Sequence, residues 1–383
     1  MEAKAQYVPS HESSKGQLGT SKPWMGSIPN PESVYAQLDR EIKAVIGSAS
    51  YSGTRAELDK SNTLLFWDFM GGGIGDAVMG LRYVKLAAEH VPDKKCIAVI
   101  HPAMMNLRHV NLPINCSLIS NVSGEFHHID YKDAVDIPLS AYGSYDKAKK
   151  PGDNTCDIAC LRSLHRYGID VTKKDLERSI ISFPESLNTI PVEYTYLFAP
   201  DAKERQAQFE DRSMKSLSLG QWRTIFEAVP SGETIGIVMG TVHREYCEAV
   251  LKEAERIASE RGFTAKRVET PTLDDLADEI VKSQTYVGMD SGTTHWAYEV
   301  AVAAKESGRT IHIKEIFNSA CFQPEVYALR GAHDIVDVLQ GPFFRFGASD
   351  NTKNDLRYIP QKDIVEFIFG KSHRTGFLHL GRR

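Results

Sequence analysis

Two short segments of the chain carry residues whose types and order could do chemistry. Residues 71–76 read Gly-Gly-Gly-Ile-Gly-Asp and follow an apolar run at 64–69, whereas residues 290–294 read Asp-Ser-Gly-Thr-Thr and follow a short apolar run at 285–288. Glycines let a backbone approach a ligand closely, and the free amides at a helix N-terminus attract anionic or polar groups. Both segments therefore predict ligand-binding turns between a strand and a helix.

Asp76 is the unusual residue of the first turn. A carboxylate at a helix start suits the helix dipole, but it would repel a phosphate bound to the same amides. This favours a general base or a hydroxyl-binding group over a pyrophosphate site. The structural alternative is an acidic residue that only stabilises the dipole, and the motif alone does not separate the two.

Each of the remaining candidate residues could also have either a ligand-binding role or a purely structural one. Asp290 could accept hydrogen bonds from sugar hydroxyls, or Ser291 or Thr293 could simply cap a helix. Lys215 precedes a helix led by an aromatic residue and could neutralise a diphosphate, although most such lysines are solvated. His243 and Glu245 follow the apolar run 234–239 and could meet a ribose or a base, or be polar residues at a helix start.

Apolar runs and amphipathic segments alternate along most of the chain, which predicts α/β architecture with parallel strands. We expect strands at 64–69, 96–101, 116–122, 194–199, 234–239, 264–268, 285–288 and 310–314, with shorter ones at 127–131 and 134–139. We expect helices at 31–46, 77–90, 157–167, 173–178, 219–229, 244–261, 273–283, 294–304 and 361–369.

These elements divide the chain into two α/β halves. We expect a flexible N-terminal arm at 1–30, a first domain at 31–183, a linker at 184–191, a second domain at 192–355, and a C-terminal helix and tail at 356–383 that can cross back to the first domain. Ligands of such pairs bind in the cleft between the domains.

Composition narrows the class of protein. The 383 residues carry Lys+Arg 45 against Asp+Glu 50, a net charge of -5, so nucleic acid is not the default partner, although a local groove with Lys147, Lys149 and Lys150 could bind it. The six cysteines lack paired metal-ligand spacing and are expected to be free thiols. No apolar run is long enough to span a bilayer and no signal-peptide core is present, which predicts a cytoplasmic protein.

The order of the candidate segments resembles that of the bacterial heptosyltransferase-like proteins, glycosyltransferase family nine. The resemblance covers about residues 62–315. Its pieces are Gly73-Ile74-Gly75-Asp76, Lys215 with Trp222, the run 240–245, and Asp290-Ser291-Gly292 followed by His-Trp-Ala where the family has His-Leu-Ala.

The resemblance implies a GT-B fold, in which two Rossmann-like domains face each other across a cleft. It implies a transferase that moves a sugar from a nucleotide-diphosphate donor, its co-substrate, to an acceptor hydroxyl without a metal or another cofactor. Asp76 would be the general base, and the acceptor-side loop would contain Gly72, Gly73 and Gly75. The donor would be bound by Lys215, His243, Glu245, Asp290, Ser291, Gly292, Thr293 and Thr294.

Departures from the family pattern keep other functions open. The N-terminal 60 residues, the extra glycines at 71–73 and the aromatic run 343–346 do not follow it, and the acceptor could be a glycan, a lipid-linked sugar, a small molecule or a modified nucleic acid. The alternatives are a noncatalytic nucleotide- or glycan-binding protein and a transferase that glycosylates modified DNA bases. A dehydrogenase is disfavoured because residues 71–76 do not complete Gly-x-Gly-x-x-Gly.

Overall fold

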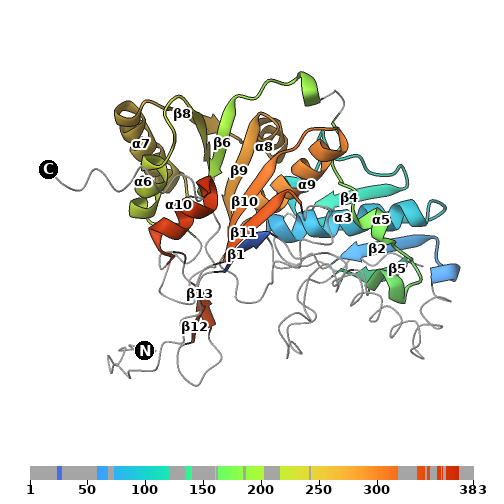
Figure 1. Cartoon of the computed structure of the whole chain (residues 1–383). Helices are drawn as coiled ribbons and strands as arrows, with labels where there is room; N and C mark the ends of the chain where they lie inside the picture. Colours follow the sequence, from blue (N-terminus) through green and yellow to red (C-terminus); the bar gives the residue numbers. More distant parts are fainter. Residues whose placement is uncertain are drawn as a thin grey trace, which may run out of the picture.

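The computed structural model describes residues 24–27, 58–67, 73–120, 134–139, 160, 163–183, 187–201, 216–240, 243–317, 334–340, 343–345, 352–354, 356 and 359–370. Figure 1 shows two sheets built mainly of parallel strands, each with helices beside it, and most strands of each sheet come from one half of the chain. The α/β fold class with two Rossmann-like domains is therefore confirmed. The expected helix at 31–46 and strand at 127–131 lie outside the described residues.

The first sheet has four parallel strands in the order β4-β3-β2-β5. Leu64 and Phe66 of β2 pack toward α3, whereas Leu65 belongs to a separate small cluster with Ile97, as the alternation of side chains along a strand requires. The elements are β2 Thr63–Trp67, α3 Ile74–His90, β3 Lys95–Ile100, the short 3-10 helix η1 Pro102–Met104, β4 Cys116–Ser120 and β5 Ala134–Pro138, followed by α5 Lys173–Leu176.

The second sheet has seven strands in the order β8-β7-β6-β9-β10-β11-β1. Its first six are parallel and follow the Rossmann order, in which the strand order reverses between β6 and β9. In sheets of this order, ligands generally bind beyond the carboxyl ends of the strands beside the reversal. The elements are β6 Tyr194–Ala199, α6 Leu219–Glu227, β7 Thr234–Met239, α7 Arg244–Arg261, β8 Thr264–Glu269, α8 Leu273–Ile280, β9 Ser283–Met289, α9 Gly292–Glu306, β10 His312–Phe317 and β11 Val336–Gln340.

Helices cover both faces of this sheet. Phe198 of β6 points into a cluster with Trp222 of α6 and Val250 of α7, whereas its neighbour Leu197 belongs to a cluster that contains Leu276 of α8 and residues of α9. The second of these clusters continues into the first domain through α3. The two domains therefore share one continuous apolar core on this side.

Residues 24–27, within the expected N-terminal arm, form a strand. We expected residues 1–30 to be a flexible arm, but β1 Trp24–Ser27 pairs antiparallel with β11 in the second sheet. Four residues without a clear alternation give no local strand signal, because their pairing depends on a partner more than 300 positions away in sequence. Strand β11 also lies in a region where the sequence analysis placed no element.

The C-terminal helix packs on the second domain. We expected the segment 361–369 to be able to cross back to the first domain, but α10 Gln361–Phe369 packs on α6 of the second domain, as Figure 1 shows. Gln221 of α6 donates hydrogen bonds to the carbonyl oxygens of Leu356 at 2.9 Å and Ile359 at 3.1 Å, which fixes the approach to α10. The buried amide of Gln221 therefore ties this helix down in a way that helical periodicity does not reveal.

Two further segments are described. Strands β12 Phe343–Arg345 and β13 Thr352–Asn354 form a small antiparallel pair. In the expected linker, the 3-10 helix η3 Leu187–Thr189 is held by Arg309, which donates to the carbonyl oxygens of Leu187 and Ile190, each at 2.8 Å. The described part of the linker is thus attached to the second domain.

Candidate active site at the domain junction

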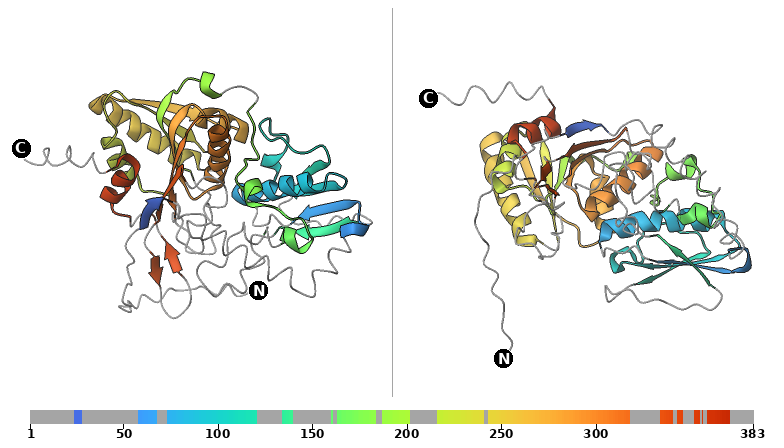
Figure 2. Two further views of the ribbon diagram at one scale, coloured as in Figure 1. Left: turned by 45° about the vertical axis from the view of Figure 1, so that its right-hand side comes forward. Right: turned by 90° about the horizontal axis from the view of Figure 1, so that it is seen from below.

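The N-termini of α3 and α9 meet where the two domains touch. Helix α3 packs directly against α9, and the two lie side by side in Figures 1 and 2. A Cβ atom added to Gly75 would lie 2.6 Å from Cδ2 of His295, and one added to Gly292 would lie 2.8 Å from the backbone nitrogen of Gly75. These distances leave no room for a side chain, so glycine at both positions permits the close contact.

The structure therefore brings together the two turns that the sequence analysis singled out. One turn follows β2 in the first domain, and the other follows β9 in the second. Each ends at a helix N-terminus, so amides and polar side chains of both domains converge there. We describe these residues, 73–76 with 290–295, as the junction.

Asp76 lies on the first turn of α3 and is half-buried. Gly73 is the N-cap residue of α3 and has no side chain with which to cap the helix. A Cβ atom at Gly73 would lie 3.3 Å from Oδ2 of Asp76, so the carboxylate folds back over the start of its own helix. Gly75, the residue before Asp76, makes the contact with the second domain.

The second turn is held by hydrogen bonds within itself. The hydroxyl of Thr294 donates to the carbonyl oxygen of Met289 at 2.5 Å, and the hydroxyls of Ser291 and Thr293 lie 2.8 Å apart. Ser291 occupies the N-cap position of α9, as the structural alternative expected, but its side chain makes no capping hydrogen bond. Asp290 is buried, with 8% of its surface exposed, and its amide donates to the carbonyl oxygen of Ile316 at 3.2 Å.

A further polar pair lies at the carboxyl end of β6 and β7. Nδ1 of His243 is 2.7 Å from Oδ1 of Asp201, a residue that the sequence analysis did not single out. Asp201 comes two residues after β6, which is one of the two strands at the order reversal. The rule that ligands bind beyond the carboxyl ends of such strands could have found it.

The remaining candidate residues either lie away from the junction or fall outside the described residues. Glu245 is exposed on the first turn of α7, and the structure brings it to neither the junction nor a described partner. Lys215 and Gly72 lie outside the described residues, as do Lys147, Lys149 and Lys150. The roles suggested for these residues stay predictions.

The segment that follows Lys215 is nevertheless anchored. The hydroxyl of Tyr246 donates to the carbonyl oxygen of Leu217 at 2.5 Å and accepts a hydrogen bond from Nε1 of Trp222 at 2.7 Å. Burial raises the pKa of the Tyr246 hydroxyl, which keeps it protonated as a donor. Trp222 and Tyr246 thus join the start of α6 to the first turn of α7.

A buried ion pair fixes α3 against α9. Nη1 of Arg82 lies 2.9 Å and 3.1 Å from the two carboxylate oxygens of Glu299, and each side chain is only 1% exposed. Glu299 also accepts from the amide of Ile180 at 3.1 Å and the hydroxyl of Ser179 at 3.2 Å. The carboxylate therefore binds both α3 and the segment that leads out of the first domain.

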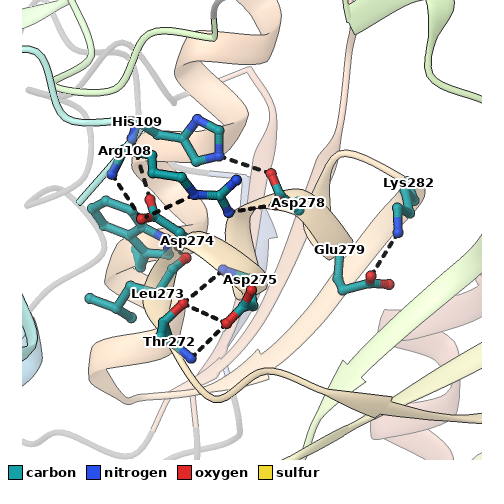
Figure 3. Close-up of polar contacts among 10 residues, drawn as sticks. Arg108, His109, Thr272, Leu273, Asp274, Asp275, Asp278, Glu279 and Lys282 are labelled. Carbon is teal, nitrogen blue, oxygen red and sulfur yellow. Dashed lines mark hydrogen bonds and ion pairs between the residues drawn. The ribbon is translucent and has the colours of Figure 1, made fainter. Parts of the chain in front are cut away.

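A second interdomain contact is drawn in Figure 3. Asp274, on the first turn of α8, accepts from the backbone amides of Arg108 at 2.8 Å and His109 at 3.3 Å. Asp278, one turn further along, lies 2.8 Å from both Nη2 of Arg108 and Nε2 of His109. Burial alone would raise the pKa of the Asp278 carboxyl, but the hydrogen bonds and charges of Arg108 and His109 lower it below its ordinary value.

Four cysteines of the described part, Cys96, Cys116, Cys160 and Cys247, are free thiols, as expected for these positions. Burial raises the pKa of Cys96 to about 12 and that of Cys116 and Cys247 to about 11, so all three are poor nucleophiles.

Among the described residues no group of three or more His, Cys, Asp or Glu side chains could hold a metal ion. The described helices include none with the length and apolar character that crossing a membrane requires.

No protein-family model matches the chain, and no curated protein matches it in sequence. Among solved structures, the chain is similar to E. coli heptosyltransferase WaaC with ADP-2-deoxy-2-fluoro heptose, at 13% identity over 80% of this chain and 98% of that chain, with a TM-score of 0.47. It is also similar to E. coli ADP-heptose lps heptosyltransferase II, at 12% identity over 80% of this chain and 97% of that chain (TM-score 0.43). A third similar structure is that of the glycosyl transferase family 9 from Veillonella parvula, at 10% identity over 75% of this chain and 88% of that chain, with a TM-score of 0.48. Similarity this low leaves function to be argued from the residues themselves.

Proposed function

We propose that this protein is a glycosyltransferase that moves a sugar from a nucleotide-diphosphate donor to an acceptor hydroxyl. The observation that carries the proposal is the contact between the turn with Asp76 and the turn with Asp290, made through Gly75 and Gly292. A transfer between two substrates needs a base on one side and a donor-binding group on the other. The junction supplies candidates for both, one from each domain.

The donor belongs in the second domain. This domain has the complete Rossmann strand order, with its reversal between β6 and β9, and Asp290 follows β9 directly. The N-terminus of α9 offers amides that its N-cap side chain does not occupy. Amides at such a position stabilise the negative charge of a diphosphate.

Asp76 is the general base in this proposal. Its carboxylate takes the proton of the acceptor hydroxyl as that oxygen forms a bond to the anomeric carbon of the sugar. The bond from this carbon to the diphosphate oxygen breaks, and its electron pair leaves with the nucleoside diphosphate. The α9 amides, together with the proposed donor ligand Lys215, stabilise the leaving diphosphate, and no metal takes part.

Donor turnover tests the proposal directly. The protein is incubated with a panel of ADP-, GDP- and UDP-sugars and a mixture of glycan, lipid-linked and small-molecule acceptors, and nucleotide release is measured. Release from one donor supports a transferase. Tight nucleotide binding without release from any donor would instead support the noncatalytic binding protein, and a folded protein that neither binds nor releases a nucleotide would contradict the proposal.

Substitution of Asp76 tests the base. We expect Asp76→Asn to lower transfer about 100-fold or more, the contribution typical of a general base, while nucleotide affinity measured by calorimetry stays within about twofold of the wild type. Asp93→Asn is the matched control, because Asp93 is an exposed aspartate of the same domain outside the junction. Unchanged turnover in Asp76→Asn would remove Asp76 from this role.

A further inference from the structure

Asp201 and His243 form a polar pair at the carboxyl end of the second sheet. Oδ1 of Asp201 and Nδ1 of His243 are 2.7 Å apart, and the two side chains are 16% and 28% exposed. Asp201 follows β6 and His243 follows β7, which are neighbours in the sheet. The pair is therefore held by two strand ends and remains reachable from solvent.

The backbone around the pair leaves space for this carboxylate. A Cβ atom added to Gly240 would lie 1.9 Å from Oδ2 of Asp201 and 2.5 Å from its Cβ. Only glycine fits at this position while Asp201 keeps its present place. The sequence at the end of β7 thus accommodates the Asp201 side chain specifically.

The His243 ring does not cap the helix that begins after it. His243 is the N-cap residue of α7, but its side chain makes no capping hydrogen bond and contacts Asp201 instead. An aspartate bound to Nδ1 selects the imidazole tautomer whose proton is on Nδ1, so Nε2 is left as a hydrogen-bond acceptor for a ligand. This is the way in which a carboxylate orients a functional histidine in many enzymes.

We propose that Asp201 is a positioning residue, which holds the His243 ring so that Nε2 accepts a hydrogen bond from a hydroxyl or amino group of the donor's nucleoside. This role rests on the proposed function. It assigns a task to a residue outside the motifs, and it explains why the end of β7 needs glycine at position 240. A purely structural Asp201 would only fasten β6 to the start of α7.

Two variants separate these roles. Asp201→Asn keeps the size of the side chain, but its amide can donate to Nδ1 and so removes the preference for a proton there. Gly240→Ala leaves both partners chemically intact and displaces the Asp201 carboxylate by steric contact, which provides an independent route if Asp201→Asn does not fold. The matched controls are Gly220→Ala, where an added Cβ has no neighbour closer than 3.8 Å, and Asp170→Asn, which alters a different histidine contact, His165 Nδ1 to Asp170 Oδ1 at 3.3 Å.

The first measurement needs no turnover. Proton–nitrogen correlation spectra of protein labelled with 15N-histidine report which ring nitrogen carries the proton, and the His243 signals are identified by their loss in His243→Gln. We expect a protonated Nδ1 in the wild type and in both control variants, and a changed tautomer in Asp201→Asn. A His243 ring with its proton on Nε2 in the wild type would overturn the positioning role.

The second measurement is the affinity for ADP, GDP and UDP by calorimetry. We expect Asp201→Asn, Gly240→Ala and His243→Gln each to weaken the nucleotide that the wild type binds by about tenfold, which corresponds to about 1.4 kcal/mol. The double variant Asp201→Asn with His243→Gln should lose about tenfold rather than 100-fold, because the two residues act as one unit.

The outcomes keep the two proposals distinguishable. Nucleotide binding by the wild type with unchanged affinity in a folded Asp201→Asn or Gly240→Ala variant would overturn the role of Asp201 and leave the proposed function standing. A wild-type protein that binds none of the three nucleotides would overturn the proposed function, and the role of Asp201 with it.

Discussion

The two interdomain contacts use the same chemistry in different surroundings. Arg82 and Glu299 pair in the interior, whereas Arg108 pairs with Asp278 at the surface, where the two side chains are 60% and 40% exposed. Breaking a buried pair by removing one partner leaves a charge in a poorly solvated place, but water replaces a partner lost at the surface. The buried contact therefore fixes how the domains sit together, and the surface contact only supports it.

The largest expected effect is that of Glu299→Ala. Removing the carboxylate leaves Arg82 buried without the oxygens that it now binds, and we expect the free energy of unfolding to fall by about 3–5 kcal/mol. Chemical denaturation measures the loss. A loss below about 1 kcal/mol would show that the interior contact is no stronger than the surface one.

Replacing both members of the buried pair sharpens the comparison. We expect the double variant Arg82→Met with Glu299→Leu to recover most of the stability that Glu299→Ala loses, because apolar side chains of similar size avoid the cost of burying a charge. The same denaturation experiment measures it. Failure to recover would indicate that the hydrogen bonds to Ser179 and Ile180 matter more than the ion pair.

Asp274 makes an interdomain contact whose expected contribution to stability lies between those of the buried and the surface pair. It is buried, with 7% of its surface exposed, and accepts two backbone amides of the other domain. We expect Asp274→Ala to cost about 1–3 kcal/mol, since one buried and one partly buried amide donor then lose their acceptor. Asp275→Ala is a useful reference, because Asp275 only closes the capping box of the same helix with Thr272, which is worth about 1 kcal/mol.

The smallest effect is expected for Asp278, and it depends on pH. The pKa of this carboxyl is lowered in the folded protein, so its contribution is present above the unfolded-state pKa, about 3.9, and is lost as the pH falls through the folded-state pKa. Because the side chain is well exposed, we expect Asp278→Asn to cost at most about 1 kcal/mol at pH 7. The difference from the wild type should shrink toward zero in acid and in high salt, and a difference that grows in acid would contradict this sign.

Hydrophobic periodicity in the sequence predicted most of the helices and strands. The periodicity that predicted strands at 194–199 and 234–239 matches the bounds of β6 and β7, and the predicted helices at 244–261 and 361–369 match α7 and α10. The turns at 71–76 and 290–294 were found because glycine and acidic residues after a strand are a local signal. The resemblance implied that they belong to two domains facing one cleft, but their direct contact was not predicted.

The remainder depends on partners that are distant in sequence. Asp201 is one acidic residue after a strand, and its meaning comes from His243, 42 positions further along. Arg82 and Glu299 each stand between apolar residues of a helix, and a charge in such a setting is a signal that could have found them. Strand β1 and the docking of α10 on α6 follow from long-range packing, which short windows do not contain.

The pairing of β1 with β11 means that the second domain is not one continuous stretch of sequence. A fragment that begins at residue 192 would contain β6 to β11 but not β1, and the backbone groups of β11 that now pair with Trp24–Ser27 would be left open. Open strand edges promote association between copies of a protein. Production of the second domain alone would therefore require the β1 segment to be fused to it or supplied as a separate peptide.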